Sequence, residues 1–482
     1  MNMETAKGNL QLLDTRTEVS LQEKAFLVQG AAKFPINAER ASKYSLFFRY
    51  ADSRRLSDPN QPVNLLIQNN GDSFQVGPCK ILTGRDLNGC SGCLVFSDTV
   101  YEFPSLLYDK KVVKLQSAFN NLAQLQGRKE RIRDFFKQYT SDLTYDLSVY
   151  KKIFDDLDFQ YREEPTAVRD SIQNAIIQSE GQNFLRFFHE KVEELNHIIK
   201  GFNRREHQQH GFYFRKQLWH FILCCALMTR TNLKPRGYAG DSEMMRMIYR
   251  DDYQGDTTFC KLMQKYTVGV PAAQSVRNRR TLIMDMLHKF RDRTCIAPPA
   301  KLKVLSVACG PAFELSDILV SPLDFGTYHF TLLDQDRLAL KEAEAHICCV
   351  EKASQRRVQA EYINMSVRLM LAGEPDFGNL GNFQFIYSMG LFDYLSTPVA
   401  KAVIEKLYRL LAPGGEMVVG NFHVSNPSRY FMEYWGDWYL IHRTEEELKE
   451  LLPKPLGAKV SINFENTGSQ MFLVAKKPES RS

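Results

Sequence analysis

The sequence predicts an α/β domain with a mostly parallel sheet that ends in an antiparallel hairpin, preceded by an all-helical domain and a small N-terminal β-barrel. Three patterns predict this order: short strand-like runs between Asn-Gly and Asp-rich turns, then a long helical pattern, then apolar runs that alternate with helical patterns. The 482 residues are enough for several hydrophobic cores, because a single core stops growing at about 250 to 300 residues.

Four segments are expected along the chain. Residues 1–43 form an N-terminal extension, and residues 44–114 contain strand-like runs such as YSLFFRYA and PVNLLIQ, which predict the barrel. Residues 115–296 follow a helical period, with apolar residues recurring at spacings of three and four. The tandem prolines Pro298 and Pro299 cannot continue a helix, so the last domain is expected to occupy residues 297–482.

In the last domain, the alternation of strand and helix patterns predicts a sheet covered by helices on both faces. The runs KVLSVA, HFTLLD, RVQAEYIN, FQFIYS and GEMVVGNF are separated by helical patterns, which favours parallel strands joined by crossover helices. Only an Asn-Thr-Gly turn separates the final runs, AKVSINFE and SQMFLVAKK. This turn is too short for a crossover helix, so it predicts the antiparallel hairpin.

Composition and charge are those of a globular protein without a strongly basic surface. The chain has 44% hydrophobic and 24% charged residues, and its formal net charge of +6 is not concentrated in an arm or tail, so nucleic acid is not an expected partner. No apolar run reaches the ~20 residues of a membrane span, and no secretory signal is visible. We therefore expect a cytoplasmic protein without stable membrane insertion. The sequence does not determine an oligomeric state.

The ten cysteines are expected to be reduced thiols that serve as small apolar side chains. Cys90 and Cys93 have zinc-ligand spacing and Cys79 is nearby, but the nearest histidine along the chain is His189. A structural zinc ion needs four ligands, so the sequence predicts no bound metal.

The turn after the first strand of the last domain is the candidate cofactor loop. In KVLSVACGPAFEL, Gly310 permits close backbone approach, and Ala308 and Ala312 are nearly as small. The full glycine fingerprint of pyrophosphate sites is missing, so a nucleoside without phosphates suits this turn better. Asp334 ends the second strand, close to the ~20 residues beyond the loop where an acidic side chain accepts hydrogen bonds from ribose hydroxyls.

Together with the terminal hairpin and the segment LYRLLAPGGEMVVGNF, these features resemble the class I S-adenosylmethionine-dependent methyltransferases, a Rossmann-like family. The resemblance covers about residues 301–477 and implies S-adenosylmethionine as the cofactor. The sequence departs from the family pattern at Ser306, where an acid is usual, and at Ala308, where the first loop glycine is usual.

Carried over by position, the resemblance implies a set of cofactor-binding residues. The loop would pack against the methionine and ribose, and Asp334 would bind the ribose hydroxyls. Met365 and Ser366 would lie by the adenine, and Ser388 and Met389 would border the reacting sulfonium. The loop residues are Ala308, Cys309, Gly310 and Pro311.

A narrower resemblance rests on KPRGYAGDSEMMRMIY, SVRNRR, IYSMGLFDYLS and NFHVSNPSRYFMEYWGDWYLIHRT. These blocks are similar to a bacterial group named for the biosynthesis of extracellular factor, 3-hydroxypalmitic acid methyl ester, a quorum-sensing signal. The similarity implies a helical lid and a hydroxy fatty acid whose carboxylate is methylated. Tyr238, His423 and Arg443 are the candidates to orient this acceptor. The run GFYFRKQLWHFILCCALM could line an acyl tunnel or form core.

The N-terminal barrel resembles PilZ-type domains, which bind cyclic dinucleotides through an arginine pair and an Asp-x-Ser turn. Here Arg49, Arg54 and Arg55 lack the usual spacing, and Asn88 stands where the turn usually has Ser. Because the phosphate-binding arginines are misplaced, cyclic di-GMP is not an expected ligand. A structural or docking role is expected for the barrel instead.

The predicted function is therefore the transfer of a methyl group from S-adenosylmethionine to a 3-hydroxy fatty acid, giving a methyl ester. A carboxylate with a reference pKa near ~4.3 is already ionised at neutral pH and needs no general base. Two alternatives remain. One is an O- or N-methyltransferase of another small molecule, and the other is a non-enzymatic cyclic-dinucleotide sensor with an inactive methyltransferase fold.

Overall fold

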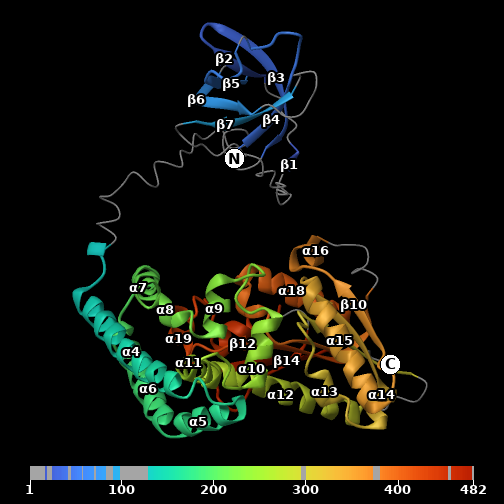
Figure 1. Ribbon diagram of the computed structural model, residues 1–482. Coiled ribbons are helices and arrows are strands. Elements are labelled where there is room, and N and C mark those ends of the chain that lie inside the picture. Colours follow the sequence, from blue (N-terminus) through green and yellow to red (C-terminus); the bar gives the residue numbers. More distant parts are fainter. Residues whose placement is uncertain are drawn as a thin grey trace. The chain divides into compact units, whose positions relative to one another are not determined.

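The computed structural model describes two compact units, one within residues Met1–Arg131 and the other within Ile132–Ser482, each with its own seven-stranded sheet (Figure 1). The described residues are 17–18, 24–41, 45–56, 58–69, 72–82, 91–97, 129–294, 300–372, 380–453 and 457–479. The expected break at Pro298 and Pro299 lies outside them, and the boundary between residues 296 and 297 stays a prediction.

The first unit is a closed barrel of six strands with a seventh short strand paired to its rim. The strands are β1 (Thr17–Glu18), β2 (Lys24–Gln29), β3 (Ala32–Ala41), β4 (Ser45–Tyr50), β5 (Val63–Asn69), β6 (Asp72–Leu82) and β7 (Ser91–Phe96). Neighbours pair antiparallel in the order β3-β2-β5-β6-β7-β4, and β3 also pairs with β4, which closes the ring. Closure removes free edges, as a small barrel requires.

Strands β2 and β3 precede residue 44, so the barrel includes part of the segment that we expected to be an extension. The alternation in KAFLVQ explains this, because Ala25 and Leu27 point into the barrel core while their neighbours are more exposed. The polar residues Lys24 and Gln29 flank only four apolar residues, so the strand pattern is short and did not stand out in the sequence.

The barrel arginines are engaged with nearby groups. Arg49 pairs with Glu39 at 2.9 Å and Arg54 with Asp52 at 2.6 Å, while the Arg55 guanidinium lies over the Tyr50 ring. Asp86 and Asn88, which we compared with the PilZ turn, lie outside the described residues, as does Cys90. The absence of cyclic di-GMP binding stays a prediction. In the described part of the chain, no group of three or more His, Cys, Asp or Glu side chains could hold a metal ion.

The second unit begins with a helical layer. Its helices are α4 (Asp134–Gln160), α5 (Thr166–Gln178), α6 (Glu180–Ile199), α7 (Arg204–Gln217), α8 (Trp219–Ile222), α9 (Ala226–Leu233), α10 (Ser242–Arg250), α11 (Thr258–Gly269) and α12 (Pro271–Arg293). In α4 the buried positions Phe136, Tyr139, Leu143 and Leu147 recur every three or four residues, as the sequence pattern predicts. None of the described helices has the length and apolar character to cross a membrane.

The run GFYFRKQLWHFILCCALM contributes to the core of this layer. Phe214, Leu218, Phe221 and Met228 are buried there among other apolar side chains. None of the residues of this run lines the cavity at the strand ends described below, whereas Leu223, Cys224 and Ala226 line a separate pocket. The acyl tunnel therefore stays a prediction.

The sheet of the second unit has the order β10-β9-β8-β11-β12-β14-β13. Its strands are β8 (Leu302–Val307), β9 (Tyr328–Asp334), β10 (Ala360–Asn364), β11 (Phe383–Ser388), β12 (Leu411–Phe422), β13 (Lys459–Phe464) and β14 (Gln470–Lys476). The first five strands pair in parallel, while β14 pairs antiparallel with both β12 and β13. The mostly parallel sheet and the terminal hairpin agree with the sequence prediction.

Helices cover both faces of this sheet. Those of the sheet layer are α13 (Leu315–Ile318), α14 (Pro322–Thr327), α15 (Arg337–Ser354), α16 (Val367–Ala372), η1 (Phe392–Tyr394), α18 (Thr397–Leu410) and α20 (Glu445–Lys449), whereas α19 (Arg429–Tyr434) packs in the core of the helical layer. One face packs on α12, α13, α14 and α15, and the other on α16, α18 and α20. Figure 1 shows α12 and α13 along one side of the unit and α16 and α18 along the other.

The segment after β12 returns to the helical layer and joins its core. Trp435, which follows α19, is 1% exposed, and its ring centroid lies 5.1 Å from that of Phe188 and 4.9 Å from that of Phe214. The helical layer and the sheet are therefore held together by residues from both ends of the unit.

We expect Trp435→Ala to lower the free energy of unfolding of this unit by about 3 to 5 kcal/mol, because a large buried aromatic side chain is replaced by a cavity. Urea denaturation followed by circular dichroism measures the change. Val424→Ala is the matched control, because Val424 is 43% exposed in the same connecting segment. A loss for Trp435→Ala no larger than that of the control would contradict the shared core.

Candidate functional site

A cavity of about 330 Å³ lies where strands β8, β9, β10, β11 and β12 end, and residues of the helical layer also line it. Ligands of open parallel sheets bind at this end of the strands. Eight of the predicted site residues line the cavity: Tyr238, Ala308, Cys309, Gly310, Pro311, Asp334, Met365 and Met389. The volume is within the ~300 to 1,000 Å³ of small-molecule sites.

The loop after β8 has a strained backbone that exposes its peptide groups. Ala308, Gly310 and Ala312 have φ values of 54°, 55° and 50°, in the left-handed region. Such conformations cost little for glycine and more for alanine, and they cluster at ligand sites. A Cβ built on Gly310 would meet no atom within 4 Å. The loop therefore leaves open space directly beside its central residue.

Asp334, at the end of β9, faces this loop. Its two carboxylate oxygens accept hydrogen bonds from the backbone N–H groups of Gly310 and Asp336, each at 2.8 Å. Burial raises the pKa of this carboxyl, and the two N–H donors oppose the rise. The donors fix the carboxylate plane, while the remaining lone pairs are available to a ligand in the cavity.

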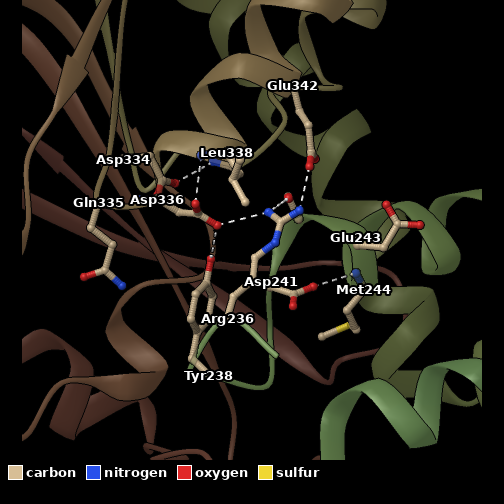
Figure 2. Close-up of polar contacts among 12 residues, drawn as sticks. Arg236, Tyr238, Asp241, Glu243, Met244, Asp334, Gln335, Asp336, Leu338 and Glu342 are labelled. Carbon is tan, nitrogen blue, oxygen red and sulfur yellow. Dashed lines mark hydrogen bonds and ion pairs between the residues drawn. The ribbon is translucent and has the colours of Figure 1, made fainter. Parts of the chain in front are cut away.

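A pair of charge contacts fastens the KPRGYAGD segment to the sheet layer (Figure 2). The Arg236 guanidinium lies 3.0 Å from Asp336 and 2.7 Å from Glu342. The Tyr238 hydroxyl points toward Asp336 and donates to it at 3.4 Å. These contacts hold Tyr238 at the cavity wall beside Asp334. Burial raises the pKa of Tyr238, so its phenol remains protonated at neutral pH.

Asp241 has the capping role that its place before Ser242 suggests. Its side chain accepts a hydrogen bond from the Met244 N–H at 3.0 Å (Figure 2). It also pairs with Arg230 at 2.5 Å. It is fully buried. The carboxylate thus stabilises the first turn of α10, as an N-cap does.

Four predicted residues do not line the cavity. Ser366 accepts a hydrogen bond from the Leu369 N–H in the first turn of α16, and Ser388 is 1% exposed at the end of β11. The His423 ring is hydrogen bonded to Ser425 and packs edge-on against Phe464. Sequence position correctly placed these residues near strand ends, but their side chains point elsewhere.

Arg443 forms hydrogen bonds with other parts of the protein next to the cavity. Its guanidinium donates to the carbonyl oxygens of Phe392 and Leu395, at 2.8 and 2.5 Å, and to the Asn421 side chain. These acceptors belong to the segment after β11 and to β12. Arg443 therefore fixes the wall that carries Asp393 and Tyr394, and it does not itself line the cavity.

The sequence analysis did not identify three charged residues that line the cavity: Arg279, Glu314 and Asp393. Glu314 is 2% exposed and accepts a hydrogen bond from the Tyr387 hydroxyl at 2.8 Å. Ser306 is close enough to this hydroxyl to oppose the rise that burial causes in the pKa of Tyr387. The Glu314 carboxyl group, which follows the loop, thus lies near Ser306, the position at which the family pattern usually has an acid.

Asp393 is the carboxyl whose pKa is shifted into the neutral range. It is 2% exposed and accepts a hydrogen bond from the Phe422 N–H at 2.6 Å. Burial raises its pKa to about 7, although that hydrogen bond and the charges of Arg279 and Arg443 oppose the rise. A group that titrates near pH 7 inside a cavity is suited to general acid–base chemistry.

No protein-family model and no curated protein sequence matches the chain. Solved structures resemble part of the chain at low identity. A Bordetella parapertussis protein described as a possible exported protein has 16% identity and a TM-score of 0.37, and the match covers 50% of this chain and 80% of that one.

Two methyltransferases are also among the similar structures. Magnesium protoporphyrin IX methyltransferase from Synechocystis PCC 6803, with bound S-adenosylhomocysteine, has 12% identity and a TM-score of 0.32, with 43% of this chain and 86% of that chain covered. The N-methyltransferase NodS from Bradyrhizobium japonicum has 15% identity and a TM-score of 0.29, with 42% and 96% covered. Likenesses of this size determine neither a reaction nor a substrate.

Asp393 should make stability depend on pH. Its folded-state pKa of about 7 lies above the ordinary value of 3.8, so its contribution to stability is fully present below about pH 4 and is lost as the pH rises through 7. We expect Asp393→Asn, which keeps an acceptor for the Phe422 N–H but cannot titrate, to flatten the fall in unfolding free energy between pH 5 and 8. Parallel stability curves for the two proteins would contradict the shifted pKa.

Proposed function

We propose that the protein is an S-adenosylmethionine-dependent methyltransferase that acts on a small-molecule acceptor. The observation that carries the proposal is the orientation of Asp334 by the Gly310 and Asp336 N–H groups, beside a loop of small residues at the ligand-binding end of the sheet. A carboxylate held in this way suits the two hydroxyls of a ribose. The absence of a glycine-rich phosphate fingerprint favours a nucleoside without phosphates.

The lining residues fit such a cofactor in chemistry and size. Asp334 would accept the ribose hydroxyls, Met365 would pack beside the base, and the loop from Ala308 to Pro311 would pack against the ribose and methionine. Glu314, a buried carboxyl group in the cavity wall, would pair with the ligand's ammonium group. When bound, the cofactor supplies an electrophilic methyl group. The protein's own part is to position the two reactants and exclude water, which dominates when a reaction needs no proton transfer.

We further propose that the acceptor is the carboxylate of a 3-hydroxy fatty acid, which would be converted to its methyl ester. The apolar part of the cavity supports an aliphatic acceptor, because Val276, Phe422, Trp438 and Leu440 face it from three parts of the chain. The product would be a signal made in the cytoplasm, and the PilZ-like barrel would serve as a docking module. Water exclusion would strengthen a carboxylate nucleophile by removing its hydration.

A second candidate function is O- or N-methylation of a phenol or amine. Asp393 favours it specifically, because a cavity carboxyl with a pKa of about 7 could accept the proton that such an acceptor must lose. The non-enzymatic sensor remains the third alternative. It would require a barrel that binds a cyclic dinucleotide and a cavity that performs no transfer.

We expect Asp334→Ala to weaken binding of S-adenosylhomocysteine by about 1 to 3 kcal/mol, because the ribose hydroxyls lose a charged acceptor. Isothermal titration calorimetry measures the affinity. Asp285→Ala is the matched control, since Asp285 is exposed on α12. Unchanged affinity in Asp334→Ala, with binding intact in the wild-type protein, would remove Asp334 from the site.

We expect kcat/KM for 3-hydroxy acids to rise with chain length until the pocket is filled, because each buried methylene contributes roughly 0.8 kcal/mol. Assays with methyl-labelled cofactor at pH 6 to 8 measure this. An ionised carboxylate imposes no rise in rate over that range, whereas a phenol or amine does. Any rise that Asp393 itself imposes is absent in Asp393→Asn. Methylation of amines or phenols without any methyl ester would eliminate the carboxylate acceptor.

A further inference from the structure

Arg279 is a buried cation among apolar side chains. In α12 the buried positions Val276, Arg279, Ile283 and Leu287 follow one another at spacings of three and four, so the arginine occupies a core position of the helix. It is only 7% exposed, and it lines the cavity at the strand ends. Burying an unpaired charge is costly, so a guanidinium in this position requires a specific reason.

The hydrogen-bond partners of Arg279 among the described residues are neutral. Its Nη1 donates to the Met389 carbonyl oxygen at 3.3 Å and its Nη2 to the Met245 sulfur at 3.2 Å. The Tyr249 phenol is a further neutral neighbour, because the charge of Arg279 opposes the rise that burial causes in the pKa of Tyr249. The buried Nε has no hydrogen-bond partner among the described residues, and no carboxylate in that part of the chain forms an ion pair with this guanidinium.

The other two arginines of the SVRNRR block are paired. Arg277 donates to the carbonyl oxygens of Ile248 and Val268 and lies 3.6 Å from Asp251. Arg280 forms an ion pair with Asp317 at 2.8 Å and donates to the Phe313 carbonyl. A structural role therefore accounts for both neighbours, and it leaves Arg279 unexplained.

Gly390 leaves space for the Arg279 guanidinium at the cavity wall. A Cβ built on Gly390 would lie 3.3 Å from the Arg279 Nη1, which is tight for a carbon atom beside a guanidinium. Glycine at position 390 thus lets the guanidinium reach the end of β11. This is the edge at which the reacting groups of the proposed transfer must meet.

We propose that Arg279 binds a carboxylate of a bound reactant, an inference that rests on the proposed methyltransferase function. A planar carboxylate matches the fork of guanidinium donors and forms two parallel hydrogen bonds. It would also lie against a charge that forms no ion pair with a described carboxylate, although Asp393 and Glu314 are close enough for the charge of Arg279 to lower their pKa values. Two reactants of the proposed reaction carry this group: the methionyl end of the cofactor and the acceptor acid.

The cofactor arm of the test compares S-adenosylhomocysteine with its decarboxylated analogue by calorimetry on the full-length protein. If Arg279 binds the cofactor carboxylate, the wild-type protein prefers S-adenosylhomocysteine by about 10- to 100-fold, the range expected for a hydrogen bond to a charged group. Arg279→Met abolishes this preference. Arg279→Lys, which keeps the charge but loses the fork, retains an intermediate preference.

The acceptor arm compares 3-hydroxypalmitate with its neutral methyl ester in the presence of saturating S-adenosylhomocysteine. If Arg279 binds the acceptor, Arg279→Met weakens binding of the acid by about 10- to 100-fold and leaves the ester unchanged. Lys289→Met is the matched control in both arms, because Lys289 is exposed on the same helix and the substitution also removes one positive charge. Melting temperatures verify that each variant is folded.

An effect of Arg279→Met on one carboxylate probe identifies the source and supports the assignment. If neither preference changes, including the case in which the wild-type protein does not bind the fatty acid, the assignment is overturned while the methyltransferase proposal stands. If the wild-type protein does not bind S-adenosylhomocysteine at all, both are overturned.

Discussion

Helix α12 is the constraint on which the second unit depends, because a single continuous helix contributes to two cores. Its first turns place Ala272, Ala273 and Val276 in the core of the helical layer, and its later turns place Ile283 and Leu287 against the sheet. The two layers therefore cannot move independently near this helix without breaking close packing. The cavity lies at the junction of the two cores, and Arg279 stands at the point where one ends and the other begins.

The second link between the layers is electrostatic. The Arg236 side chain is 17% exposed and forms ion pairs with the carboxylates of Asp336 and Glu342. Because the arginine is mostly removed from water, loss of either partner would leave a buried charge poorly compensated. Asp336 also caps α15. The Asp336 carboxylate thus caps α15, pairs with Arg236 of the helical layer and accepts a hydrogen bond from Tyr238. The start of α15 and the position of Tyr238 at the cavity wall are therefore coupled.

Periodicity and turn chemistry predicted the elements of the second unit well, because both are local properties. The alternating runs gave the parallel strands, and the short Asn-Thr-Gly turn gave the hairpin. Asp334 could be found because the end of a strand can be located in the sequence, and the strand ends of a parallel sheet form its ligand-binding edge. Arg279 could not be found in this way, because it contacts Met389, which is 110 residues away in the sequence. An arginine within the apolar stripe of a helix does not indicate which group it will contact. His423 and Arg443 show the converse: both follow β12 as expected, but their side-chain directions depend on packing.

The charges around the cavity constrain one another, and this bears on which acceptor the site can process. Arg279 and Arg443 both lower the pKa of Asp393 from the value that burial alone would give it. An anion bound to Arg279 would offset part of that effect, so the pKa of Asp393 would rise and the group would stay protonated at neutral pH. A protonated Asp393 cannot act as a base, but it can donate a hydrogen bond. A carboxylate acceptor at Arg279 and a proton-accepting Asp393 are therefore opposed states of one site, and the carboxylate acceptor is the one that requires no base.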